Sequence, residues 1–116
     1  MEIADVQETW IHTHFIVDSW EILPDERFKI DMRVEPELRR LGIQYGLHYE
    51  RRPQAENFAI VLECIPFPKT RDYIKELIGE TIKDFPARKR EEQRNAVTKI
   101  TIQEKDSGTP TENMER

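Results

Sequence analysis

The pattern of apolar and polar residues predicts one long amphipathic helix in the second half of the chain. Over residues 71–85 the apolar side chains recur every three or four positions, which is the spacing of a helix that buries one face. The apolar positions are Tyr73, Ile74, Leu77, Ile78, Ile82 and Phe85. We expect Thr70 to cap this helix and Pro86 to end it. A stripe this wide needs a cover, and we expect upstream strands to supply it.

Four upstream segments have the pattern of β-strands. Residues 8–23 are rich in aromatic and β-branched side chains without a helical stripe, so we expect one long strand or a bent pair there. Residues 28–34 and 43–50 alternate apolar with polar positions, and residues 58–65 form the most apolar strand candidate. Short polar connections between successive strands favour an antiparallel meander.

The C-terminal part of the chain is more polar. Residues 87–95 are highly charged, and we expect a second, solvated helical stretch there. Residues 96–103 alternate in a way that predicts a short edge strand, with Thr98, Ile100 and Ile102 against Val97, Lys99 and Thr101. Residues 104–116 have no periodicity and are expected to be disordered. We therefore predict a single α+β domain over residues 1–103, with an antiparallel sheet of four to five strands packed against one main amphipathic helix.

Composition narrows the classes of partner and compartment. The net charge of −5, with both signs interspersed, argues against nucleic acid and anionic membranes as partners. The basic stretch at residues 88–94 contains two glutamates and no interleaved aromatic residue for base stacking. A single cysteine, Cys64, fits a reducing compartment. Without a secretion signal or an apolar run of the roughly 20 residues that span a bilayer, we expect a cytoplasmic protein.

Candidate catalytic chemistry is sparse. Four scattered glycines form no phosphate-binding loop. Cys64 has no neighbouring basic residue in sequence to lower its pKa, so we interpret it as a small buried apolar residue. We predict no catalytic residue and no cofactor, and a non-enzymatic role.

One alternative is a metal site. His12 and His14 are two residues apart on a predicted strand, so their side chains point to the same side about 7 Å apart. His48 and Glu50 have the same relation on another predicted strand. If the two strands brought these faces together, four nitrogen and oxygen ligands would converge. A small metal-binding protein or metal-dependent enzyme is the alternative function.

The preferred hypothesis is an interaction module. The first predicted strand is apolar on both faces, so it is either central in a sheet or covered by a second copy of the chain. We expect the partner-binding surface to include Trp10, Ile16, Trp20 and Ile22. The expected partners are polypeptide segments or another protein, and the chain is expected to form a homo-oligomer.

A family resemblance points the same way. Residues 67–77 resemble the segment of SecB-type export chaperones in which a Phe-Pro dipeptide, here Phe67-Pro68, opens the main helix, and an arginine, here Arg71, follows three residues after the proline. The upstream order of a long first strand and three further strands is also similar, so the resemblance covers roughly residues 8–85. It implies a SecB-like α+β fold, dimers or tetramers, and a surface groove that binds unfolded polypeptide.

Overall fold

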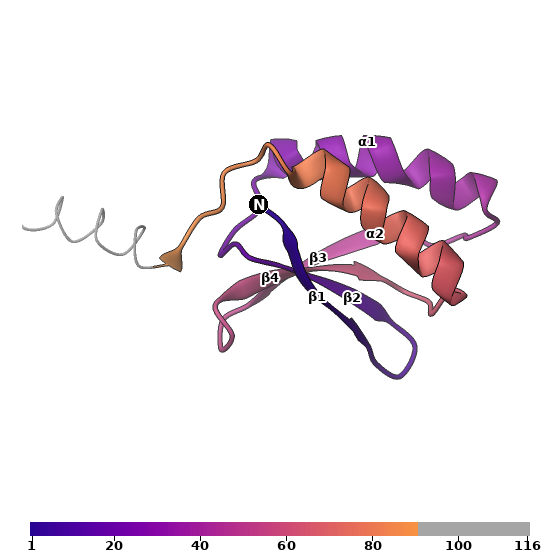
Figure 1. The fold of residues 1–116 in the computed structure, drawn as a ribbon, viewed down its shortest axis with the longest axis horizontal. Helices are drawn as coiled ribbons and strands as arrows, with labels where there is room; N and C mark the ends of the chain where they lie inside the picture. Colours follow the sequence, from indigo (N-terminus) through magenta and orange to yellow (C-terminus); the bar gives the residue numbers. More distant parts are fainter. Residues whose placement is uncertain (91–116) are drawn as a thin grey trace, which may run out of the picture.

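The structure, a computed structural model of the chain, describes residues 1–90 and shows an α+β fold (Figure 1). The elements follow the order ββαββα. Their bounds are β1 Ile3–Glu8, β2 Thr13–Val17, α1 Pro24–Arg40, β3 Leu47–Arg52, β4 Asn57–Leu62 and α2 Pro68–Ile82. The four strands form one antiparallel sheet, as predicted, but two helices rather than one main helix pack on it.

The strand order β1-β2-β4-β3 places β2 and β4 in the centre and β1 and β3 at the edges. The predicted meander is therefore wrong, because α1 separates β2 from β3 and β2 pairs with β4. The units β1–β2–α1 and β3–β4–α2 have the same order of elements, two strands followed by a helix. The second strands of the two units, β2 and β4, pair in the centre of the sheet, and the first strands, β1 and β3, form its two edges. Both helices cover the same face of the sheet (Figure 1).

The largest error of the sequence prediction is at residues 28–34, which lie in α1 and not in a strand. In the helix, Ile30 and Val34 are fully buried, whereas Phe28 and Met32 are 62% and 63% exposed. Phe28 precedes Ile30, and Met32 lies between Ile30 and Val34. Apolar residues therefore occupy every second position from 28 to 34, which imitates the alternation of a strand. The true buried stripe of α1 is Glu26, Ile30, Val34 and Leu38, at the four-residue spacing of a helix.

The ends of α1 carry ordinary helix signals. Pro24 stands at the first helical turn, followed by two acidic residues that favour the positive end of the helix dipole. After the C-terminus, Gly42 adopts a positive φ of 80°. The N–H of Ile43 donates to the carbonyl of Leu38 at 2.8 Å, which is the bond that closes a helix with glycine at this position. Pro36 lies inside the helix without ending it.

The long strand or bent pair predicted for residues 8–23 is instead the end of β1, a hairpin turn, β2 and the connection that leads to α1. β1 begins before Glu8, and a turn over residues 9–12, closed by the Thr9 N–H donating to the His12 carbonyl at 2.9 Å, leads into β2. β2 is central in the sheet, which is one of the two arrangements expected for a strand that is apolar on both faces. Trp20 and Ile22 lie after β2 and belong to no strand.

The remaining elements differ from the prediction mainly at their boundaries. α2 begins at Pro68 and ends at Ile82. Thr70 is not its cap, because Phe67 occupies that position and Pro68 provides the first helical residue without needing an N–H partner. β3 overlaps the predicted range 43–50 but begins four residues later and ends two residues later, and β4 overlaps the predicted range 58–65 but ends three residues earlier.

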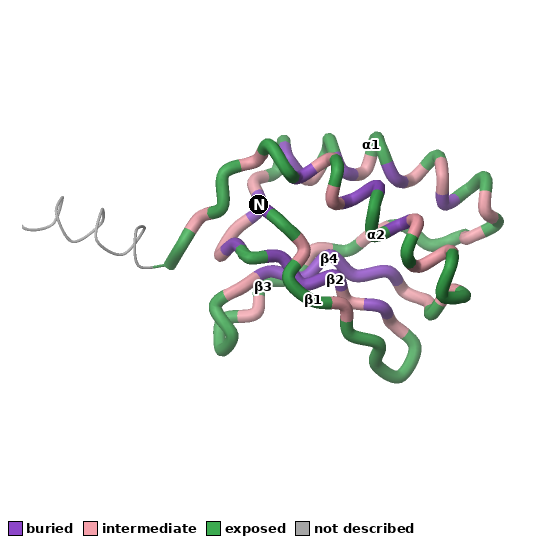
Figure 2. The backbone as a smooth tube through the Cα atoms, in the orientation of Figure 1, coloured by how far each residue is buried: buried purple, intermediate pink, exposed green. Residues whose placement is uncertain are grey.

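The core lies between the helices and one face of the sheet. Phe15, Val17, Phe58, Ile60 and Leu62 from the central strands pack against the buried residues of both helices. On the other face, Ile16, Ala59 and Val61 form a small second cluster and are also buried (Figure 2). A hydrogen bond of 3.3 Å joins Arg52 of β3 to Gln7 of β1, so these side chains reach across the two central strands and help to cover the cluster.

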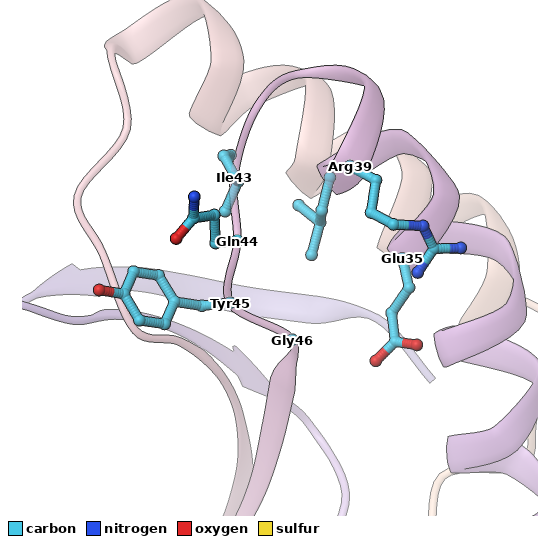
Figure 3. A pocket seen from close by; sticks show the side chains of 7 residues that line it. Glu35, Arg39, Ile43, Gln44, Tyr45 and Gly46 are labelled. Atoms are coloured by element: carbon cyan, nitrogen blue, oxygen red, sulfur yellow. The ribbon is translucent and has the colours of Figure 1, made fainter.

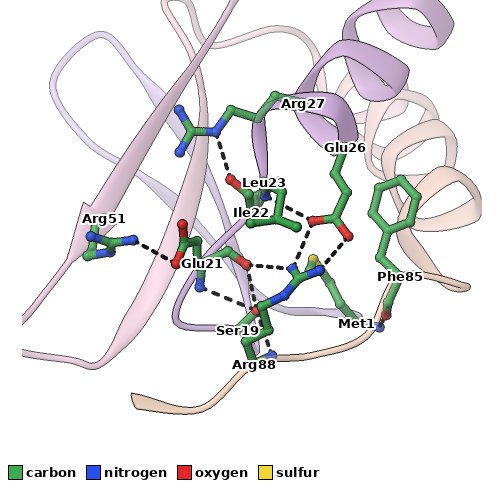
Figure 4. A network of polar contacts seen from close by, with 10 residues as sticks. All are labelled: Met1, Ser19, Glu21, Ile22, Leu23, Glu26, Arg27, Arg51, Phe85 and Arg88. Carbon is green, nitrogen blue, oxygen red and sulfur yellow. Dashed lines mark hydrogen bonds and ion pairs between the residues drawn. The ribbon is translucent and has the colours of Figure 1, made fainter. Parts of the chain in front are cut away.

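After α2 the chain turns back to the start of α1, and polar contacts hold it there (Figure 4). The guanidinium of Arg88 donates to both carboxylate oxygens of Glu26, at 2.9 and 3.0 Å. The N–H of Arg88 donates to the Ser19 hydroxyl, and the N–H of Trp20 donates to the Arg88 carbonyl. Residues 83–90, which we call the C-terminal strap, thus close one end of the domain.

The strand predicted for residues 96–103 and the tail predicted for residues 104–116 lie outside the described residues, as does most of the helical stretch predicted for 87–95. Within the described part of the chain, neither helix combines the length and the apolar character that crossing a membrane requires.

A candidate protein-interaction surface

Three connections carry large exposed apolar side chains at one end of the sheet. The turn between β1 and β2 presents Trp10, which is 90% exposed, and Ile11. The segment between β4 and α2 presents Ile65 and Phe67, of which Phe67 is 85% exposed. The segment before β3 presents Tyr45. We call these five residues the apolar end.

The strand register places these connections together. Thr13, Leu62 and Leu47 pair in one row across β2, β4 and β3, and each of the three connections lies next to this row. The hydroxyl of Thr13 donates to the Cys64 carbonyl at 2.8 Å, which holds the chain after β4 beside the start of β2. An ion pair of 3.2 Å between Arg71 and Glu8 joins the first turn of α2 to the end of β1.

The backbone presents Phe67 in a defined way. Phe67 stands between Pro66 and Pro68, and it has the extended φ and ψ of −58° and 152°. Proline restricts its own φ and keeps the preceding residue out of the helical region. A side chain on such a stiff segment loses little backbone entropy when it binds a partner.

Two shallow hollows flank the segment before β3. One, of about 260 Å³, is lined by Gly42, Ile43, Gln44, Tyr45 and Cys64. The other, of about 240 Å³, lies on the α1 side and is lined in part by Glu35, Arg39 and Gly46 (Figure 3). Both are smaller than the roughly 300–1,000 Å³ of typical small-molecule pockets. They suit single side chains of a partner better than a complete metabolite.

Cys64 lines the first hollow and is partly rather than fully buried. Burial raises the pKa of its thiol. The thiol is therefore protonated at neutral pH and is a poor nucleophile there. Cys64 contributes a small apolar wall to the hollow.

The structure separates the four residues predicted to bind a partner. Trp10 belongs to the apolar end. Ile22 is fully buried in the core and Ile16 is 3% exposed, so neither is available to a partner, which corrects the prediction for both. Trp20 lies at the opposite end of β2, partly buried, with the guanidinium groups of Arg51 and Arg90 at 4.7 and 5.1 Å from its ring.

Sequence reasoning missed Ile11, Tyr45, Ile65 and Phe67 as surface residues. The strands predicted over residues 8–23, 43–50 and 58–65 include Ile11, Tyr45 and Ile65, and in a strand every apolar residue is expected to have a face to pack on. Phe67 was the one residue whose sequence context indicated an exposed position, because an aromatic residue between two prolines cannot belong to the interior of a strand or helix.

The residues of the predicted metal site do not converge. The rings of His12 and His14 are 6.1 Å apart. His48 instead pairs with Glu63, at 2.8 Å between Nε2 and Oε2, and Val61 lies between His14 and His48 in the sheet. Over residues 1–90, no three histidine, cysteine, aspartate or glutamate side chains are grouped so that they could hold a metal ion. The geometry therefore gives no support to the metal-binding alternative.

Comparison with known proteins adds no relative. No protein-family model, curated protein or solved structure matches this chain. The SecB-like resemblance of residues 67–77 stays a prediction. One of the four strands that were compared upstream of the helix, residues 28–34, is part of helix α1. What the structure itself shows is a two-layer α+β domain in which five of the seven large exposed apolar residues of the described chain lie in the connections at one end of the sheet, while Phe28 and Met32 lie on α1.

Proposed function

We propose that the protein is a non-enzymatic interaction module that binds apolar polypeptide segments through the apolar end. The observation that carries this proposal is the exposure of Trp10 and Phe67, at 90% and 85%, beside three further large apolar residues. Clustered exposed apolar residues on a small domain mark interaction sites, and buried aromatic anchors contribute most to protein–protein affinity.

The surroundings of the apolar end support a polypeptide as the ligand. The ion pair between Arg71 and Glu8 gives a polar border beside the aromatic residues, as in the rim of a protein interface. The hollow beside Tyr45, of about 260 Å³, is large enough to receive one side chain of such a ligand. A chaperone-like role, with several copies acting together as the SecB-type resemblance implies, is part of the proposal.

Binding of a fluorescently labelled apolar peptide, followed by anisotropy, tests the proposal. The variant with Trp10→Ser and Phe67→Ser should bind at least about tenfold more weakly than wild type, which corresponds to about 1.4 kcal/mol. The matched control is Phe28→Ser with Met32→Ser, which removes two other large exposed apolar residues, both on α1. This control should bind within about twofold of wild type.

Equal losses in both variants would mean that the peptide adheres to any exposed apolar residue, and the proposal would be wrong. A loss confined to the α1 variant would move the site to the outer face of that helix. Thermal melts of both variants check that the substitutions, all at exposed positions, leave the fold intact.

A further inference from the structure

The two edge strands of the sheet differ in how well they are protected against pairing with another strand. β1 contains an irregularity between Ile3 and Asp5. The Asp5 carboxylate also accepts hydrogen bonds from the Val6 N–H at 2.8 Å and from the Gln7 amide. Irregularities and side chains that occupy backbone donors are common protections of edge strands. β1 is therefore a poor partner for a further strand.

β3 is regular along its whole length, because its residues pair with β4 without a shift. Within residues 1–90, no strand lies on its other side. Leu47 and Tyr49 pack on the helix-covered face and are partly exposed, whereas His48 and Glu50 are exposed on the open face. This edge offers unpaired backbone groups flanked by one partly apolar and one polar row of side chains.

The symmetry of a dimer restricts how a second copy of β3 can pair with this edge. Two copies that pair antiparallel are related by a two-fold axis perpendicular to the sheet, so each residue faces the one that stands equally far from the axis in the partner. An axis at Tyr49 pairs residues 47–51 of one copy with those of the other, and an axis at Glu50 pairs residues 48–52 in the same way. The axis at Glu50 sets two carboxylates directly opposite each other, which is destabilising.

The axis at Tyr49 gives favourable pairs on both faces of the sheet. On the open face, His48 of each copy stands opposite the partner's Glu50, an imidazole against a carboxylate. On the helix-covered face, Tyr49 stands opposite the partner's Tyr49, and Leu47 lies against the methylene groups of the partner's Arg51. Aromatic pairs, and pairs that are hydrogen-bonded or oppositely charged, stabilise adjacent strands. The edge of β3 is therefore self-complementary in this register.

The same register also covers an exposed aromatic residue. Tyr45 precedes β3 and is 52% exposed. Positions 45 and 53 are equally far from Tyr49, so Tyr45 of each copy comes next to the turn that follows the partner's β3. In that turn, residues 52–55 line a hollow of about 360 Å³, which has room for one aromatic ring.

We propose that the chain forms a two-fold dimer in which the β3 strands of two copies pair antiparallel with the axis at Tyr49. The two four-stranded sheets then join into one continuous sheet, with all helices on the same face. The dimer specifies how several copies of the proposed interaction module meet, and in that respect it rests on the proposed function. Strand pairing itself needs neither Trp10 nor Phe67.

Disulfide formation between single-cysteine variants tests the register, in full chains that also carry Cys64→Ser. The variants are His48→Cys and Glu50→Cys, both at exposed positions. In the proposed register, position 48 lies directly opposite position 50 of the partner, with Cα atoms about 4.5–5.5 Å apart, within reach of a disulfide. Two copies of the same variant hold their cysteines on a diagonal, about 7–8 Å apart. Under mild oxidation, a mixture of the two variants should therefore cross-link at least about tenfold faster than either variant alone.

The matched control is a mixture of Asp5→Cys and Gln7→Cys, which have the same spacing on the other edge strand, β1. This mixture should cross-link only at the slow rate of random collisions. Mass spectrometry separates the mixed cross-link from self cross-links, because the variants differ in mass. Faster cross-linking of one β3 variant alone would place the axis at that residue, and equal rates in all samples would show that β3 does not pair with itself. Either result overturns the proposal.

Sedimentation equilibrium provides an independent measurement and separates this proposal from peptide binding. The wild-type chain should be a dimer at the concentration used for cross-linking, and the variant with Trp10→Ser and Phe67→Ser should remain a dimer while it binds peptide more weakly. A monomeric wild-type chain would overturn the dimer and leave the peptide-binding result as it stands. Loss of the dimer in the Trp10→Ser, Phe67→Ser variant would place the contact at the apolar end instead of at β3, which also overturns the proposal.

Discussion

The contact between Arg88 and Glu26 makes a quantitative prediction about stability. Glu26 is only 5% exposed, and both of its carboxylate oxygens accept hydrogen bonds from the Arg88 guanidinium. In Arg88→Ala the Glu26 carboxylate loses both hydrogen bonds from the guanidinium. It keeps the hydrogen bond from the N–H of Leu23, at 2.9 Å. Breaking a buried ion pair by removing one partner typically costs about 3–5 kcal/mol.

Partial exposure lowers the expected cost. The Arg88 side chain is 22% exposed, so water can replace part of the lost contact. We therefore expect Arg88→Ala to lower the free energy of unfolding by about 2–3 kcal/mol, a large share of the roughly 5–15 kcal/mol that stabilises a typical domain. Urea denaturation followed by tryptophan fluorescence measures this difference.

The matched control is Arg33→Ala. Arg33 pairs with Glu80 at 3.6 Å, and both side chains are more than half exposed. Exposed pairs contribute about 0–1 kcal/mol, so this variant should be close to wild type. If Arg88→Ala is no less stable than Arg33→Ala, the strap does not anchor the end of the domain and the reasoning fails.

The pH dependence provides a second check. Burial alone would raise the pKa of Glu26, but the hydrogen bonds from Arg88 and Leu23 outweigh it and lower the pKa below the usual 4.5. A lowered carboxyl pKa stabilises the folded state above the unfolded-state value, and this contribution disappears as the pH falls through the folded-state pKa. The difference between wild type and Arg88→Ala should therefore be constant near neutral pH and shrink below about pH 4.5.

Three further predictions concern the core, the open face of the sheet and the thiol. Leu77→Ala should cost about 2–5 kcal/mol in denaturant melts, because Leu77 is 4% exposed between helix and sheet, whereas Lys75→Ala on the exposed side of α2 should cost under about 0.5 kcal/mol. Burial lowers the pKa of His14, so its neutral form is favoured in the folded protein and stability should fall as the pH drops below 6.5; His14→Gln should show a shallower decline in thermal midpoint. Because burial raises the pKa of Cys64, iodoacetamide should label it more slowly in the folded protein than in urea.

The parts of the fold that sequence reasoning predicted correctly have a single dominant period. α2 has one buried stripe and no large exposed apolar residue between its members, so its position was recognised to within three residues at each end. β4 is buried on both faces as a central strand, which explains its continuous apolar run. In both elements the environment of each face matches the chemistry of its residues.

The prediction failed where apolar residues are exposed. Phe28 and Met32 on the outside of α1 imitated a strand, and Trp10 and Ile11 in the turn after β1 hid the hairpin, because no glycine or proline marks it. The apolar end was missed for the same reason. Periodicity assumes that apolar residues are buried, so the residues best suited to bind a partner are those that such an argument places wrongly.

The repeated ββα order has a consequence for how the domain could be divided. Residues 1–40 and 47–90 each hold one strand pair and one helix, and one short connection over residues 41–46 joins them. Neither half alone can bury its sheet, since a two-stranded ribbon is at best marginally stable in water. The pairing of β2 with β4 and the ion pair between Glu26 and Arg88 both cross from one half to the other. A cut within residues 41–46 would therefore yield two fragments that fold only by reassembling, the arrangement used in split reporters of molecular proximity.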